Sequence, residues 1–291
     1  MSIWILRNCV FQAMKFQNIW RSLGAVGGGS LATYVGLKLI ERNQTHEAYH
    51  EKQEMVGRGG WCHDWDQRQL VQQKLSSESG IEHEQEPEAV ALRHIVLVRH
   101  GEYKASPDGG HLTELGRLQA HRTGQRLHEM GVTWDHVVAS TMSRAQETAM
   151  IILKQINFDP LKMKRCELLP EGTPCPADPP QNRSVESVER AFRRDGPRIE
   201  AAFRRYFFRA SPEQKQDSYL LVIGHANVIR YLVCRALQFS PEAWTRFTLH
   251  HGSITWLTVW PTGYVTLRCL GDTGFMSINE LTHRRPKEQV K

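Results

Sequence analysis

The sequence has few cysteines, and none of them stands in a metal-binding or disulfide pattern. The six form no Cys-x-x-Cys pair and recur at no regular spacing: Cys9, Cys62, Cys166, Cys175, Cys234 and Cys269. A zinc site or a disulfide framework needs such a pattern, so we expect free thiols and no metal. The chain also lacks a basic stripe interleaved with aromatic residues, and its formal net charge is only +6. This composition gives no support to nucleic-acid binding.

Acidic residues are absent from the beginning of the chain, where the first is Glu41. An acid-free start punctuated by arginine and lysine is typical of mitochondrial targeting segments. Residues 22–37 carry no charge, and extending this stretch to Ile40 approaches the length that spans a bilayer. We therefore expect residues 1–40 to direct the chain to mitochondria and to anchor it in a membrane, with the outer membrane as the expected site. The alternative is a flexible, cleavable leader that never stays in a membrane.

Apolar residues are scarce in the next segment, and we interpret residues 41–91 as a polar linker. One island interrupts it, where Trp61 and Trp65 lie four residues apart and Asp66 follows. Two tryptophans in polar surroundings need a surface against which to bury their rings. A neighbouring subunit would make Trp61, Trp65 and Asp66 an oligomerisation site, whereas the chain's own domain would make them a local packing motif. The sequence leaves both interpretations open.

The residues from 95 to 102 form the stretch around which the remainder of the chain is organised. Residues 95–98, Ile-Val-Leu-Val, predict a strand buried on both faces. Arg99 and His100 follow it, and ligands of open α/β sheets bind at the carboxyl ends of strands. Arg99 offers donors that match phosphate oxygens, and a neutral His100 is a suitable nucleophile toward phosphorus. The alternative is a surface arginine beside a half-buried histidine.

Three further positions place polar side chains after predicted strands. Arg144 follows the strand 136–139, Glu171 lies in a Leu-Pro-Glu-Gly stretch, and His225 follows the buried strand 219–223. A phosphoryl group needs fixed positive charge around its oxygens during transfer, and the leaving serine or threonine oxygen needs a proton. The sequence therefore predicts a catalytic set and a phosphate-binding set: His100, Glu171 and His225 for the first, and Arg99, Arg144 and His225 for the second.

Other elements follow from local signals. Thr113 predicts the N-cap of a helix that ends at Gly131. The arginine-rich stretch between 184 and 209 predicts a helix with a break or kink at Gly196-Pro197. Its arginines are expected to form a solvated face, the alternative being a grip on acidic phosphoprotein segments. Residues 253–259 and 265–270 predict two strands that pair through a turn.

The order of these motifs resembles the histidine phosphatase (phosphoglycerate mutase-like) superfamily. The matching stretches are LVRHGE at 97–102, LTELGRLQA at 112–120, SxxxRAxET at 140–148, LPEG at 169–172 and GHA at 224–226. The resemblance covers nearly all of residues 92–275. It implies an α/β fold whose central, mostly parallel sheet is flanked by helices. It also implies the site roles given above and no cofactor.

Within the superfamily, the chain lacks the serine and Trp-Asn pair that follow RHGE in glycolytic mutases, and it is similar to a mitochondrial serine/threonine phosphatase branch. That branch implies phosphoprotein substrates and self-association, as a dimer or larger, through a WDxNWD-type segment. This chain departs from that segment with Cys-His-Asp at 62–64. Relatives also bind a Kelch-type ubiquitin-ligase adaptor, but residues 76–81 lose two positions of that motif, so this partner is not carried over.

The sequence thus predicts four regions: an anchor at 1–40, a linker at 41–91, a phosphatase domain at 92–280 and a basic tail at 281–291. The expected function is a membrane-tethered mitochondrial protein serine/threonine phosphatase that acts through a phosphohistidine. One alternative is a mitochondrial scaffold with an incidental phosphatase site. The other is a small-molecule phosphatase with the same chemistry.

Overall fold

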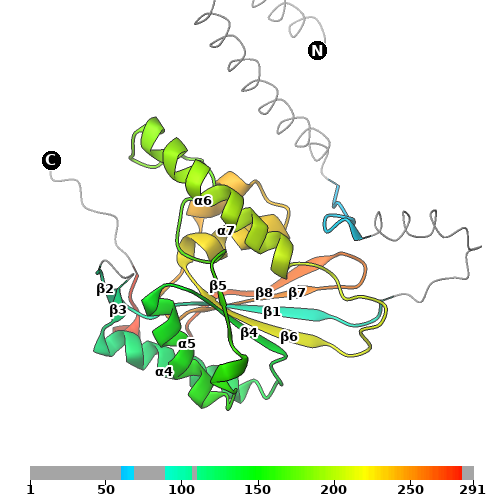
Figure 1. Cartoon of the computed structure of the whole chain (residues 1–291), viewed down its shortest axis with the longest axis horizontal. Helices are drawn as coiled ribbons and strands as arrows, with labels where there is room; N and C mark the ends of the chain where they lie inside the picture. The colour runs from blue at the N-terminus through cyan, green and yellow to red at the C-terminus, as the bar shows by residue number, and fades with distance from the viewer. Residues whose placement is uncertain (1–59, 69–88, 107–109, 284–291) are drawn as a thin grey trace, which may run out of the picture. The chain divides into compact units, whose positions relative to one another are not determined.

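The computed structural model describes residues 60–68, 89–106 and 110–283. Their central element is a six-stranded sheet in the order β5-β4-β6-β1-β7-β8 (Figure 1). Its parallel strands are β5 (Lys164–Cys166), β4 (His136–Ser140), β6 (Ser218–Gly224) and β1 (Arg93–Arg99). The strands β7 (Ile254–Val259) and β8 (Val265–Asp272) complete the sheet in antiparallel pairing. The predicted mostly parallel α/β sheet is confirmed.

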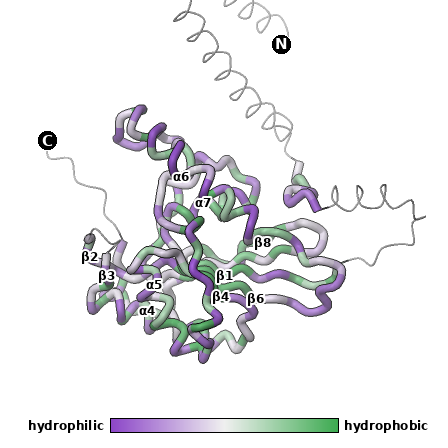
Figure 2. Tube along the Cα trace, in the orientation of Figure 1, coloured by the Kyte–Doolittle hydropathy of each residue, from purple (hydrophilic) through white to green (hydrophobic). Residues whose placement is uncertain are grey.

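Strand β1 lies in the middle of the sheet, and all seven of its residues are buried. Because side chains alternate along a strand, Ile95 and Leu97 enter the core on one face, and Val96 and Val98 enter the core on the other. Figure 2 shows hydrophobic residues, in green, gathered along the central strands β1, β4 and β6. Truncation of Leu97 to alanine is expected to cost about 2–5 kcal/mol of stability. The predicted strand buried on both faces is confirmed.

Helices cover both faces of the sheet (Figure 1). One layer contains α4 (Glu114–Glu129) and α5 (Ser143–Gln155), and the other contains α6 (Val185–Tyr206), α7 (Ala226–Ala236) and the short η2 (Pro241–Arg246). Helix α4 begins as predicted, since the Thr113 hydroxyl accepts a hydrogen bond from the Gly116 N–H at 3.0 Å. Among the described residues, every helix is too short or too polar to cross a bilayer.

Helix α6 corrects one expectation. A break or kink was predicted at Gly196-Pro197; the break is not observed, because the helix continues through both residues, and the kink stays a prediction. Pro197 removes one backbone hydrogen bond from the helix. The apolar side of the following turns, with Ile199 and Phe203, is fully buried on the sheet. That burial offsets the lost bond, and the helix ends only at Tyr206.

The carboxyl ends of three parallel strands meet at one edge of the sheet. Arg99 at the end of β1 is in register with Gly224 at the end of β6, and β4 ends beside them at Ser140. The two-stranded hairpin of β2 (Tyr103–Lys104) and β3 (His111–Leu112) follows β1 at this edge. The turn between β7 and β8 lies at the opposite end, because Val259 is paired with Arg93. The short helices η1 (Pro160–Lys162) and η3 (Ile278–Glu280) complete the fold.

Candidate active site

His100 lies directly after β1 and is only 2% exposed. Its backbone N–H donates to the Gly224 carbonyl at 3.0 Å, which fixes it beside the end of β6. The chain then passes the start of α4 so closely that a Cβ built on Gly116 would lie 1.9 Å from the Glu102 carbonyl oxygen. Only glycine at 116 permits this approach, which holds the loop after His100 against the helix.

The hydrogen bonds of His100 define which ring nitrogen is free to react. Nδ1 lies 2.8 Å from the Gly101 carbonyl oxygen, which can only accept, so Nδ1 carries the proton. The lone pair is therefore on Nε2, to which the Arg144 Nε–H donates at 3.0 Å. Burial lowers the pKa of His100 well below its ordinary value, and His225, Arg99 and Arg144 lower it further. The imidazole is neutral, as a nucleophile must be.

Arg99 is buried, and its guanidinium presents one edge that has no partner. Nη1 donates to the Leu249 carbonyl at 2.5 Å, and Nη2 lies 2.8 Å from His251 Nε2. Nε has no hydrogen-bond partner among the described residues. Burial lowers the pKa of Arg99 to about 10, so the group is cationic at neutral pH. A buried cation with an unused donor is suited to bind an oxyanion.

Arg144 enters from the first turn of α5 and is 5% exposed. Its guanidinium carbon lies 4.4 Å from the centre of the Tyr103 ring, which belongs to β2. The edge of the same ring faces His100, with centroids 5.1 Å apart. Tyr103 thus forms an aromatic wall beside the nucleophile and orients the arginine by a cation–π contact.

His225 follows β6 and is completely buried. Its ring centre lies 5.0 Å from that of His100, and its Nε2 lies 2.8 Å from the Ser140 hydroxyl. Nδ1 has no partner within the described part of the chain. Burial, followed by Arg144 and Arg99, lowers the pKa of His225 well below its ordinary value. With Ser140 on one nitrogen, the other is left for a ligand.

Glu171 lies in the irregular loop between β5 and α6. Its Oε1 accepts the Asn227 N–H at 3.2 Å and the Gly172 N–H at 3.3 Å. Burial raises the pKa of the carboxyl, although Arg99, Arg230 and Arg144 act against the shift. A carboxyl with a raised pKa near two phosphate-binding arginines can act as a proton donor.

The structure therefore brings all five predicted residues to one edge of the sheet. The unpartnered Arg99 Nε and His225 Nδ1 are buried polar groups, and such groups are rarely left without a partner. Together with the His100 lone pair they are suited to bind an anion. In the described ranges, no group of acidic, histidine or cysteine residues could hold a metal ion.

Sequence reasoning gave no role to several residues that build this site. Ser140 stands inside the recognised SxxxRAxET stretch, so the motif contained it without indicating its partner. Asn227 directly follows the GHA motif, and its side chain accepts from Arg230 and donates to the Gly172 carbonyl. His251 precedes β7, and no local pattern distinguishes it. Each of these roles depends on a partner at least 55 residues away, except the contact between Asn227 and Arg230.

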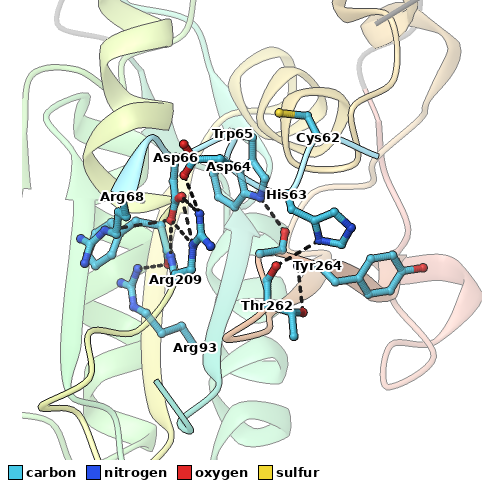
Figure 3. A network of polar contacts seen from close by, with 12 residues as sticks. Cys62, His63, Asp64, Trp65, Asp66, Arg68, Arg93, Arg209, Thr262 and Tyr264 are labelled. Carbon is cyan, nitrogen blue, oxygen red and sulfur yellow. Dashed lines mark hydrogen bonds and ion pairs between the residues drawn. The ribbon is translucent and has the colours of Figure 1, made fainter. Parts of the chain in front are cut away.

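The tryptophan island, residues 61–68, lies against its own chain in the structure (Figure 3). Trp61 and Trp65 donate through their indole N–H groups to the Gly263 carbonyl in the β7–β8 turn, at 3.3 and 2.6 Å. Asp66 accepts from both the backbone and the side chain of Arg209. The local packing that the sequence left open is thus observed within one chain. Self-association through Trp61, Trp65 and Asp66 stays a prediction.

Two sequence predictions lie outside the described residues. These are the targeting and membrane segment at 1–40 and the altered adaptor motif at 76–81. The basic tail at 281–291 is described only to His283, and there it packs on the domain, since the His251 N–H donates to the Thr282 carbonyl at 2.9 Å.

Comparisons with known proteins identify the family. The family model of the histidine phosphatase superfamily (branch 1) matches residues 95–273. The protein named serine/threonine-protein phosphatase Pgam5, mitochondrial, of Drosophila pseudoobscura pseudoobscura is 49% identical over 273 residues, which are 89% of this chain and 94% of that protein. The protein of the same name from Drosophila virilis is 58% identical over 203 residues, covering 69% of this chain and 70% of its own. Among solved structures, phosphoglycerate mutase from Plasmodium falciparum is 32% identical, with 69% of this chain and 98% of that chain covered and a TM-score of 0.46.

Proposed function

The chain belongs to the histidine phosphatase superfamily, and from this premise we propose that it is a mitochondrial protein serine/threonine phosphatase that acts through a phosphohistidine. The observation that carries the proposal is the neutral His100, whose reactive Nε2 lies beside Arg144 at the same sheet edge as two unpartnered buried nitrogens, Arg99 Nε and His225 Nδ1. The relatives named Pgam5 supply the substrate class and the compartment.

In the first step the Nε2 lone pair of His100 attacks phosphorus. The Arg144 N–H that occupies Nε2 in the free site moves to a phosphoryl oxygen, while Arg99 Nε and His225 Nδ1 bind the remaining oxygens. The new P–N bond forms as the bond between phosphorus and the serine or threonine oxygen breaks. Preorganised donors of this kind stabilise the charge that develops on the phosphoryl oxygens.

Glu171 completes both halves of the reaction. Its protonated carboxyl, favoured by the raised pKa, gives its proton to the leaving alkoxide, and the dephosphorylated protein departs. A water molecule then attacks the phosphohistidine, and the Glu171 carboxylate takes a proton from it. The P–N bond breaks, inorganic phosphate leaves, and His100 and Glu171 return to their starting states.

The nucleophile is tested directly with His100→Ala. We expect turnover to be abolished while the circular dichroism spectrum and melting temperature stay close to those of the unchanged protein, because His100 lies after the strand and outside the apolar core. Acid-labile, base-stable phosphate on the wild-type chain after rapid quenching would identify the intermediate. Near-normal turnover by His100→Ala would overturn the mechanism.

The substrate class is tested with the wild-type protein. Phosphoserine and phosphothreonine peptides are compared with sugar phosphates at equal concentration. Preference for the peptides supports the proposal, whereas preference for sugar phosphates favours a small-molecule phosphatase. No turnover of either, with a folded chain, favours a scaffold.

We further propose that residues 1–40 anchor the chain in the outer mitochondrial membrane and that Trp61, Trp65 and Asp66 support self-association. The first rests on the acid-free basic start and the uncharged 22–37 stretch. A fusion of residues 1–40 to a fluorescent protein should reach mitochondria and resist carbonate extraction. The double substitution Trp61→Ala and Trp65→Ala should reduce the mass measured by light scattering, and unchanged mass would limit the island to packing within one chain.

A further inference from the structure

The C-terminal segment, residues 277–283, is fixed beside the phosphate site by hydrogen bonds from two elements. Gln119 of α4 donates through Nε2 to the Glu280 carbonyl at 2.6 Å and to the Thr282 hydroxyl at 2.9 Å. The His251 N–H donates to the Thr282 carbonyl at 2.9 Å. A capping box between Ser277 and Glu280 closes η3 at the start of the segment. These bonds give Thr282 a defined position next to His251.

His251 lies between this segment and Arg99. It is 5% exposed, and its ring centre is 5.5 Å from that of His100. Nε2 lies 2.8 Å from Arg99 Nη2, while Nδ1 lies 2.9 Å from the Thr282 hydroxyl oxygen. A continuous line of hydrogen bonds therefore runs from Thr282 through His251 to the arginine.

The direction of these hydrogen bonds follows from their end groups. A guanidinium can only donate, so His251 Nε2 accepts from Arg99. The proton of the neutral ring is therefore on Nδ1, which donates to Thr282. Burial and then Arg99 lower the pKa of His251 to about 3, which agrees with a neutral ring. Gln119 supplies a second donor to the Thr282 oxygen, so both acceptor positions of this hydroxyl are used.

We propose that His251 and Thr282 are positioning residues for Arg99, so that the C-terminal segment is a working part of the active site. With Leu249 holding Nη1 and His251 holding Nη2, the guanidinium turns its remaining Nε toward the phosphate. Arg99 sets the tautomer of His251, and Thr282, which accepts the Nδ1 proton, fixes the orientation of the ring. The inference rests on the proposed function in that it takes a phosphoryl group as the ligand of Arg99.

Thr282→Val is the most selective test, because valine keeps the shape of threonine and removes only the hydroxyl. In the full-length protein, binding of inorganic phosphate is measured by calorimetry, and kcat and KM are measured with a phosphoserine peptide. We expect Thr282→Val to weaken phosphate binding and to lower kcat/KM by about tenfold. The reason is the loss of one buried hydrogen bond in the line that runs from Thr282 through His251 to the charged Arg99. Thr282→Ser, which keeps the hydroxyl, should stay within about twofold of wild type.

A merely structural role of Thr282 is separated by a double-mutant cycle with Arg99→Lys. Lysine keeps the positive charge but cannot be oriented through two fixed nitrogens. In the Arg99→Lys background, Thr282→Val should therefore have little further effect on phosphate binding. Ile278→Ala serves as a control for changes in the segment itself, since Ile278 is 83% exposed. It should bind phosphate as the wild type does.

Three results would overturn the inference: normal phosphate binding by folded Thr282→Val, equal impairment of Thr282→Ser, or additive effects in the cycle. If Arg99→Lys does not fold, the nitrogen NMR shifts of His251 replace the cycle. Thr282→Val should shift the Nδ1 signal, because the hydrogen bond from Nδ1–H to the hydroxyl is lost, and an unchanged signal would overturn the inference. A wild-type protein that binds phosphate but cleaves no phosphopeptide would refute the proposed function, and the binding data would still decide the role of Thr282.

Discussion

Two arginines at opposite ends of the central sheet are equally buried but differ in how their charge is balanced. Arg99 at the carboxyl end of β1 is 5% exposed, and Arg209 near the amino end is 7% exposed. Burial lowers the pKa of Arg99 to about 10. Hydrogen bonding to Asp66 raises the pKa of Arg209 above its ordinary value, despite burial. Among the described residues, Arg209 forms ion pairs with carboxylates, whereas the Glu171 charge acts on Arg99 without forming an ion pair with it.

The contrast separates a cation that is paired with carboxylates from a cation that we propose binds a ligand. Arg209 contacts the carboxylates of Asp64 and Asp66, and the Asp66 side chain is only 2% exposed. Arg99 makes no ion pair in the described part of the chain. Its guanidinium contacts the Leu249 carbonyl and the His251 imidazole, and its Nε has no partner among the described residues. An unbalanced buried charge costs stability, and a dianionic phosphoryl group is the partner that would balance it.

Replacing each arginine with methionine is expected to give the largest difference between the two ends of the sheet. Arg99→Met should lower kcat/KM for phosphopeptides by about 10²–10³-fold, as the loss of a preorganised donor does. Its free energy of unfolding should fall by about 1–3 kcal/mol, because the Leu249 carbonyl and His251 Nε2 lose their donor but no ion-paired carboxylate is left behind. Enzyme kinetics and urea denaturation measure the two effects.

Arg209→Met should give the opposite result. Removing Arg209, the main partner of the buried Asp66, costs about 3–5 kcal/mol, and the tryptophan island should detach from the domain. Phosphate binding by the opposite sheet end should stay within about twofold of wild type, as distant sites behave independently. A stability loss in Arg99→Met as large as that in Arg209→Met would remove the distinction between the two arginines.

If it is ionised, Glu171 places a carboxylate near the arginines of the active-site end, as Asp66 does beside Arg209 at the amino end. Because burial raises its pKa, it remains protonated to a higher pH than an ordinary glutamate, and kcat should fall as pH rises through that pKa. Glu171→Gln should lower kcat for phosphoserine peptides by about 100-fold and abolish this decline. In kcat/KM, which reports the formation of the phosphohistidine and not its shared hydrolysis, phenyl phosphates with good leaving groups should be far less affected, because their oxygen needs no proton. Equal losses of kcat/KM on both substrates would exclude Glu171 as the acid.

The sequence predicts the sheet and the five principal residues because both are written locally. Residues 95–98 and 219–223 are apolar runs, and each is followed within two residues by a polar side chain that the strand end must present to the site. These strands could therefore be predicted without knowledge of distant contacts. Local propensity wrongly predicts a break at Pro197, because burial of Phe203 and Ile199 on the sheet outweighs one missing hydrogen bond.

The supporting residues could not be predicted, since their roles are relations between distant parts of the chain. Ser140 acts on His225 across 85 positions, and Arg99 acts on His251 across 152. The tryptophan island posed the same difficulty, because its docking depends on Gly263 and Arg209. A sequence pattern indicates that Trp65 needs a surface, but only the folded chain shows which surface is near.

Ser140→Ala sharpens the comparison by changing a neutral group at the active-site end. Without the hydroxyl, His225 Nε2 loses its 2.8 Å partner and the ring is free to change tautomer. We expect kcat/KM to fall by about tenfold, the effect of one lost positioning hydrogen bond. Ser253→Ala is the matched control, because Ser253 is equally buried and its hydroxyl has no partner among the described residues. Equal effects of the two substitutions would assign the loss to packing.

The smallest effect is expected from acid at the amino end. Burial alone would raise the pKa of Asp66, but its hydrogen bonds and charge interaction with Arg209 lower it below the ordinary value. A carboxyl whose pKa is lowered on docking stabilises the docked state fully above its free pKa of about 3.9, and this stabilisation is lost as pH falls through the lower, docked value. The indole N–H signals of Trp61 and Trp65, which donate to Gly263, should therefore keep their docked shifts well below pH 4. Asp66→Asn cannot form the ion pair and should show weaker docking that does not depend on the titration of residue 66. Asp64→Asn leaves the contacts of Asp66 with Arg209 and should stay docked. Release of the wild-type island already at pH 5 to 6 would mean that Asp66 is not the group that holds it.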